Sequence, residues 1–107
     1  MSRIKRVLMV SSEAVPFAKS GGLADVVTSL SAALLENGTD VRILMPYYSF
    51  ANVEAAEDLQ IEVTVPLGIS QESGRLYRTW LPRKRVPVYL LANSHFYERE
   101  GIYGGRD

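Results

Sequence analysis

The chain has 107 residues, of which 47% are hydrophobic, enough for a buried core but for no more than one domain. Lys plus Arg equals Asp plus Glu at 12 each, and this zero net charge argues against a nucleic-acid-binding or membrane-surface protein. The absence of cysteine excludes disulfides, thiolate chemistry and zinc–cysteine sites, and the single histidine disfavours a histidine-based metal cluster. No apolar run approaches the roughly 20 residues of a membrane span, so we expect a cytoplasmic protein.

The first half of the chain predicts a strand, a helix and a second strand. Residues 4–10 and 40–46 are nearly continuous apolar runs, as in parallel strands covered on both faces. Residues 11–21 are expected to form a loop, because Pro16 and a glycine pair interrupt regular structure. A helix is predicted over residues 23–37, with Gly38 as the left-handed residue that ends it. One apolar stripe should pack this helix on the sheet: Leu23, Val26, Val27, Leu30, Ala33 and Leu34.

The second half predicts three further strands. A loop with a short helix at about residues 53–58 comes first. LQIEVTVPL (59–67) and RLYRTWLP (75–82) alternate apolar and polar residues, which indicates an antiparallel pair joined by a turn at SQESG (70–74). Residues 86–92 have the apolar pattern of a central strand, and residues 93–107 are expected to be loop or short helix. The predicted fold class is α/β, Rossmann-like, with a mostly parallel open sheet and an antiparallel strand pair.

The stretch SSEAVPFAKSGGLADVV, residues 11–27, carries the pattern most typical of a ligand site. Open parallel sheets bind ligands outside the carboxyl ends of their strands, and a helix N-terminus there favours phosphate. Gly21 and Gly22 let a ligand approach the backbone, and Lys19 adds a positive charge. Neither a dinucleotide fingerprint nor a P-loop fits, because there is only one glycine pair and Ala18 precedes the lysine. The alternative is a helix capped by Ser20 or Gly21, with Lys19 solvated.

The same stretch resembles the N-terminal Lys-x-Gly-Gly-Leu signature of bacterial glycogen synthases and plant starch synthases. LLENGTDVRILMPYY and YLLANSHFYEREGIYG are similar to the next conserved stretches of that family, in the same order. The resemblance implies that residues 1–107 are an incomplete N-terminal domain of a GT-B-type glycosyltransferase with two Rossmann-like domains. Such an enzyme transfers glucose from ADP-glucose to the non-reducing end of an α-1,4-glucan such as glycogen, with retention and without a metal or organic cofactor. Lys19 matches the lysine assigned to ADP-glucose binding, and Gly21 and Gly22 match the glycines that approach the diphosphate and the sugar.

Four more residues have both a structural and a functional interpretation. Asp25 lies in the first turns of the helix, where it complements the helix dipole or contacts sugar hydroxyls, and the resemblance favours the sugar. For Glu13 we favour a solvated or Lys19-paired carboxylate over a direct substrate contact. Tyr103, in GIYGG, matches a family tyrosine near the donor site and either stacks on a sugar or packs within its loop. His95 is expected to be structural, and no catalytic residue is assigned within the chain.

Two positions depart from the family pattern, and two other classes of protein stay open. Ser20 replaces the usual threonine and keeps its hydroxyl, whereas Ala92 stands where relatives often carry an aspartate. The chain ends before the family's first domain would be complete, so we expect it to be inactive by itself and to self-associate through exposed apolar surface. One alternative is a stand-alone module that binds a sugar nucleotide or phosphate without turnover. The other is a flavodoxin-like or response-regulator-like domain, which the Lys-Ser-Gly-Gly loop fits poorly.

Overall fold

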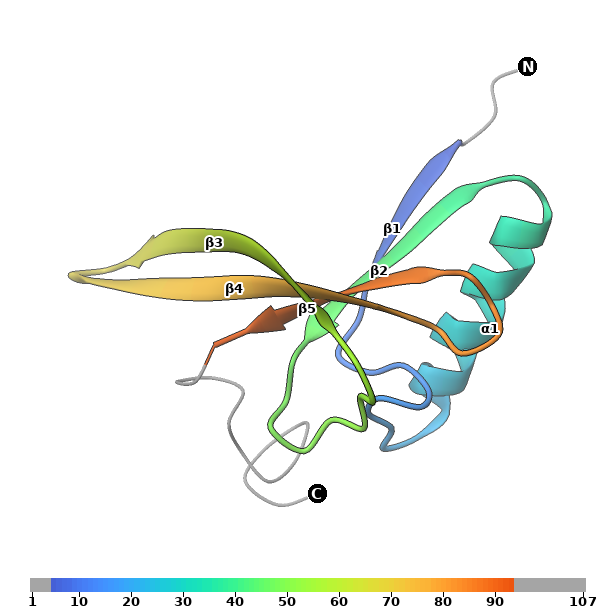
Figure 1. The fold of residues 1–107 in the computed structure, drawn as a ribbon, viewed down its shortest axis with the longest axis horizontal. Helices are drawn as coiled ribbons and strands as arrows, with labels where there is room; N and C mark the ends of the chain where they lie inside the picture. The colour runs from blue at the N-terminus through green and yellow to red at the C-terminus, as the bar shows by residue number, and fades with distance from the viewer. Residues whose placement is uncertain (1–4, 94–107) are drawn as a thin grey trace.

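The computed structural model describes residues 5–93, which form a mixed five-stranded sheet and one helix (Figure 1). The elements are β1 (Arg6–Val10), α1 (Gly22–Glu36), β2 (Asp40–Pro46), β3 (Glu57–Leu67), β4 (Ser70–Trp80) and β5 (Pro87–Ala92). The strand order is β1-β2-β5-β4-β3, in which β1 and β5 run parallel to β2. The α/β, Rossmann-like fold class is confirmed. The antiparallel part is larger than expected, because β4 pairs with β5 as well as with β3 and the hairpin thereby extends the same sheet.

The core lies between α1 and one face of the sheet, which we call the inner face. Alternate residues of β2 and β5 point to this face and are at most 1% exposed: Val41, Ile43, Met45, Val88 and Leu90. The loops that follow β1 and β2 also contribute to this core, through Phe17 and Tyr48. The hairpin of β3 and β4 extends away from α1 in Figure 1, so its far end lies beyond this core.

Helix α1 packs on the sheet through a different side from the predicted stripe. Its buried residues are Ala24, Val27, Thr28 and Ser31. Three members of the predicted stripe are instead 45–59% exposed: Leu23, Val26 and Leu30. The stripe is therefore wrong except at Val27 and at Leu34, which packs against the core. Short side chains on the buried side let the helix lie close to the sheet. The predicted end is confirmed, since Gly38 has φ +89° and donates to the Leu35 carbonyl at 2.9 Å.

Two local predictions in the second half are wrong. Residues 51–56 form no helix, and β3 begins at Glu57, inside the predicted short helix. The hairpin turn is Gly68–Ile69 rather than residues 70–74, which instead form the start of β4. Gly68 has φ +63° and takes the first position of a two-residue turn, the position that favours glycine in hairpins. The position of the turn was thus set by the positive φ that Gly68 can adopt, although the segment that follows it is more polar.

Candidate functional site

The loop between β1 and α1 is attached to the core at several points. Ala14 and Ala18 exchange two backbone hydrogen bonds of 3.0 Å, which close the middle of the loop into a tight unit. Phe17, inside this unit, is 5% exposed and belongs to the core. The Tyr48 hydroxyl donates to the Ser12 carbonyl at 2.8 Å. The loop therefore presents residues 19–22 from a supported position at the carboxyl end of β1, where open sheets bind ligands.

The buried side chain of Glu13 holds the last part of this loop in place. Its side chain is 1% exposed, so the predicted solvated carboxylate is wrong. One carboxylate oxygen accepts the backbone N–H groups of Ser20 and Gly21 at 3.2 and 3.3 Å, and the other accepts the Ser20 hydroxyl at 2.9 Å. A carboxylate that accepts N–H groups at the start of a helix is stabilised by both the hydrogen bonds and the helix dipole. Glu13 thus fixes the conformation of the residues that follow Lys19.

Lys19 forms its ion pair with Asp25 rather than with Glu13. The Lys19 Nζ and Asp25 Oδ2 atoms are 2.8 Å apart, and the two side chains are 50% and 57% exposed. An exposed pair of this kind contributes only about 0–1 kcal/mol to stability, so the fold does not depend on it. The pair holds a cation over the first turn of α1, where an arriving anion could compete with the Asp25 carboxylate.

The start of α1 is open to an external anion. Gly21 is the N-cap residue and has no side chain with which to cap the helix, and the Glu13 carboxylate accepts from the N–H group of Gly21 itself and from Ser20 at the helix start. Gly21 has φ −166°, extended backbone that any residue adopts, and a Cβ atom added at Gly21 or Gly22 would meet nothing within 4 Å. Neither backbone strain nor packing within the described residues requires glycine here. The reason for two glycines at this place therefore lies outside the described residues.

The structure brings together five of the residues singled out from the sequence. Around the start of α1 lie Lys19, Gly21, Gly22 and Asp25, and the buried Glu13 accepts a hydrogen bond from Gly21. The other two, Tyr103 and His95, lie outside the described residues.

Sequence reasoning missed the residues that support the loop, among them Thr28 and Tyr48. The Thr28 hydroxyl accepts the Val15 N–H at 3.1 Å, and Tyr48 is 1% exposed. The sequence offered no clear signal for either residue, because Thr28 lies in a helix that also carries Asp25, Ser29 and Ser31.

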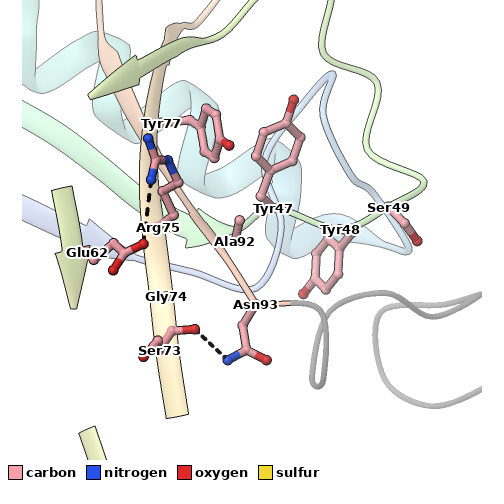
Figure 2. A pocket seen from close by; sticks show the side chains of 10 residues that line it. All are labelled: Tyr47, Tyr48, Ser49, Glu62, Ser73, Gly74, Arg75, Tyr77, Ala92 and Asn93. Atoms are coloured by element: carbon pink, nitrogen blue, oxygen red, sulfur yellow. Dashed lines mark hydrogen bonds and ion pairs between the residues drawn. The ribbon is translucent and has the colours of Figure 1, made fainter. Parts of the chain in front are cut away.

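A separate polar hollow lies near the carboxyl ends of β2 and β5 (Figure 2). Its volume is about 510 Å³, and Tyr47, Tyr77, Arg75 and Ala92 are among its lining residues. The rings of Tyr47 and Tyr77 meet edge to face at 5.3 Å, and the Arg75 guanidinium lies 3.5 Å from Glu62. No residue of the Lys19 loop lines this hollow. Its two tyrosine rings pack against each other and its arginine is paired with Glu62, so this hollow is separate from the site at α1.

Residues 5–93 contain neither a metal-binding cluster nor a membrane-spanning helix. That part of the chain holds no group of three or more His, Cys, Asp or Glu side chains placed to bind a metal ion. Its helix is also too short and too polar to cross a membrane.

Comparison with known proteins identifies the family of this chain. The family of starch synthase catalytic domains matches residues 6–107. "Glycogen synthase 1" of Geobacter sulfurreducens is 46% identical over 107 residues, covering 96% of this chain and 21% of the relative. The glycogen synthase of Treponema denticola is 40% identical over 99 residues, covering 92% and 20%. The catalytic domain of starch synthase IV from Arabidopsis thaliana, solved with ADP and acarbose, superposes with a TM-score of 0.83 at 27% identity, covering 96% of this chain and 22% of that one. The chain spans about a fifth of the length of these relatives, and it belongs to the starch synthase catalytic domain family, together with bacterial glycogen synthases.

Proposed function

We propose that this chain supplies the donor-binding loop of a glucosyltransferase that extends an α-1,4-glucan from ADP-glucose with retention of the anomeric configuration. The observation that carries the proposal is the start of α1, where Lys19 lies beside two glycines that packing within residues 5–93 does not require. Membership of the family, and the ADP and acarbose bound by a structural relative, support a nucleotide sugar and a glucan as the ligands.

In this proposal each residue of the loop has a distinct task. The N–H groups at the start of α1 and the Lys19 ammonium bind the diphosphate, because both favour negative charge. Gly21 and Gly22 let the diphosphate and the sugar lie against the backbone. Asp25 holds Lys19 in place and contacts sugar hydroxyls, whereas Glu13 acts through the shape of the loop. Tyr103 is proposed to stack on the donor sugar.

Residues 1–107 are proposed to be part of the N-terminal domain of a longer, two-domain cytoplasmic enzyme. The leaving diphosphate gains negative charge during transfer, and one lysine with one helix terminus stabilises only one side of it. The opposite side would come from a second domain across a cleft. No step of this chemistry calls on a metal or an organic cofactor. The isolated chain is expected to associate with itself, since its sheet leaves apolar residues exposed.

A chimeric enzyme tests the proposal directly. Residues 1–107 would replace the matching stretch of the Geobacter sulfurreducens relative, with which they share 46% identity. ADP release from ADP-glucose, dependent on added glycogen, would be compared with release from UDP-glucose. NMR of the lengthened glucan would give the configuration of the new bond. Transfer of α-linked glucose from ADP-glucose supports the proposal. A folded chimera that transfers from neither donor, or that forms a β-linkage, contradicts it.

Matched variants assign the activity to the loop. Lys19→Ala should lower kcat/KM for the donor by roughly 100-fold, the size of effect seen when one charge-stabilising group is removed. Lys84→Ala removes a lysine from the exposed turn between β4 and β5 and should leave transfer unchanged. Equal activity of the two variants would remove Lys19 from the donor site. ADP binding by the isolated chain, combined with a folded chimera that does not transfer, would favour a stand-alone binding module.

A further inference from the structure

The turn that joins α1 to β2 contains an asparagine followed directly by a glycine, Asn37 and Gly38. Both residues are exposed, and a Cβ atom added at Gly38 would meet nothing within 4 Å. In such a pair the side-chain amide can react with the backbone nitrogen of the next residue, because glycine places no side chain beside its own nitrogen. No step of the proposed glucosyl transfer uses this pair, which lies at the end of α1 away from Lys19.

The reaction of this pair needs only water and a base. The base removes the proton of the Gly38 N–H group, and the nitrogen then attacks Asn37 Cγ. The Cγ–Nδ2 bond breaks, the leaving nitrogen takes up a proton to become ammonia, and a cyclic imide remains. Water then adds to one of the imide carbonyl carbons and opens the ring. Opening at Cγ gives isoaspartate or aspartate according to which C–N bond breaks: the bond to the side-chain carbon gives aspartate, and the bond to the main-chain carbon gives isoaspartate.

The carboxyl end of α1 restrains the nitrogen that would attack. The Gly38 N–H group donates to the Leu35 carbonyl at 2.9 Å, and the Thr39 N–H group donates to the Leu34 carbonyl at 3.0 Å. With Gly38 at φ +89°, these two hydrogen bonds form the Schellman motif, which we call the cap of α1. A backbone proton held in a hydrogen bond reaches a base only when that bond opens. The side chain of Leu34 packs against the core, so the fold holds the cap in place.

The backbone of Asn37 also keeps the two reacting atoms apart. Its ψ is 9°, which turns the Gly38 nitrogen toward the Asn37 nitrogen. Because Cβ occupies another corner of the tetrahedral Cα atom, Cγ reaches the Gly38 nitrogen only after rotation about the Cα–C bond. That rotation takes the Gly38 N–H group away from the Leu35 carbonyl. The reaction and a closed cap therefore exclude each other.

We propose that Asn37 is a site of spontaneous deamidation that the cap of α1 controls, so that only molecules with an open cap react. The exposure of the pair by itself would favour reaction in every molecule. The hydrogen bond of Gly38 and the ψ of Asn37 both oppose it. The rate in the folded chain is then the rate in the unfolded chain multiplied by the fraction of open caps. This inference depends on the cap alone and is independent of the proposed function.

Deamidation would prevent the cap from closing again in its original form. Either product places a carboxylate at the carboxyl end of α1, where the helix dipole is negative and Glu36 and Asp40 are near in sequence. Isoaspartate also adds one carbon to the main chain before Gly38. The hydrogen bonds of Gly38 and Thr39 to successive carbonyls then no longer fit together. The modification is thus irreversible and should loosen the connection between α1 and β2.

Deamidation would be followed in the 107-residue chain at mildly alkaline pH, with and without urea. Peptide mass mapping would locate the product, and peptide fragmentation would separate aspartate from isoaspartate. Asn52 is an internal control, because the branched side chain of Val53 shields the nitrogen that would attack. Asn37→Gln is the control that keeps a neutral amide and removes the reactive residue. Hydrogen exchange of the Gly38 N–H group, measured in the same buffer, gives the fraction of open caps.

We expect Asn37 to deamidate at least tenfold more slowly in the folded chain than in urea, and Asn52 to stay unmodified in both. The slowing should agree within about threefold with the exchange protection of the Gly38 N–H group, since both need the same opening. Leu34→Ala removes the side chain that anchors the cap, so it should raise the folded rate and lower the protection by the same factor.

Three results would overturn the inference. Equal rates with and without urea, in a chain that circular dichroism shows to be folded, would mean that the cap gives no control. A slowing that differs from the exchange protection by more than about tenfold would mean that the reaction does not follow the opening of the cap. Absence of deamidation at Asn37 in urea would mean that the pair is not reactive. The chimera with the Geobacter sulfurreducens relative gives the folded rate if the isolated chain associates too strongly.

Discussion

Replacing Glu13 with alanine should destabilise the chain by roughly 2–4 kcal/mol, because the start of α1 loses its internal acceptor. The carboxylate is 1% exposed and accepts hydrogen bonds of 3.2, 2.9 and 3.3 Å from Ser20 N, Ser20 Oγ and Gly21 N. A hydrogen bond to a charged group contributes about 1.5–3 kcal/mol net. The two longer bonds come from N–H groups near the surface, which water can satisfy, so the short bond and the cavity left behind supply most of the cost.

Glu13→Gln separates hydrogen bonding from charge. The amide oxygen can still accept both backbone N–H groups, and the amide NH₂ can donate to the Ser20 hydroxyl. Only the charge is lost, so the expected cost is roughly 1 kcal/mol. Urea unfolding followed by circular dichroism, at low protein concentration to limit association, would give both free energies of unfolding. The reasoning is refuted if Glu13→Ala stays within about 0.5 kcal/mol of the parent chain, or if glutamine costs as much as alanine.

Four further outcomes are expected. Gly74→Ala should cost roughly 1–2 kcal/mol, because its Cβ would lie 2.6 Å from Leu91 Cδ1, and the cost should disappear in a Leu91→Ala background when urea midpoints are compared. Ser31→Ala should be neutral or stabilising by up to about 1 kcal/mol, since the buried Ser31 hydroxyl has no hydrogen-bond partner within residues 5–93; a clear loss in thermal stability would show that it has one. Hydrogen bonds from Arg75 lower the pKa of Asp58, so the stability from this pair is present above the unfolded pKa of about 3.9 and is lost as pH falls through the lower folded value. The difference in urea midpoint between the parent chain and Asp58→Asn should therefore shrink on acidification. A difference that grows would contradict the pair's role. The isolated chain should release no ADP from ADP-glucose with added glucan, and release that depends on glucan would show that a second domain is dispensable.

Local pattern predicted the central elements of the fold well. The apolar runs that became β1, β2 and β5 are recognisable because parallel strands are covered on both faces and need few polar residues. Gly38 marked the end of α1 because few other residues adopt positive φ at that place. The hairpin was expected, but its turn was misplaced by a few residues. A two-residue turn needs only one glycine, and the polar segment after it is equally typical of an exposed strand.

Within the candidate site, the residues were predictable and their contacts were not. Lys19 and the glycine pair stand out because their residue types suit an anion at a helix start. The pairing of Lys19 with Asp25, and the burial of Glu13, depend on how the loop folds back against the core. A carboxylate after a strand looks solvated in the sequence, because nothing local shows that three donors from residues 20 and 21 will enclose it.

The sequence by itself determined the order of the five strands and α1, the place of the loop after β1 and the residue types of that loop, since each depends on residues close together in the chain. Only the tertiary structure decided which side of α1 meets the sheet. The helix has apolar residues on two sides, and the close approach to β2 selected Ala24 and Val27 over the larger Leu23 and Leu30. It also decided which sheet face α1 covers and which face keeps apolar residues such as Val10 exposed. Those choices depend on contacts between residues far apart in the chain.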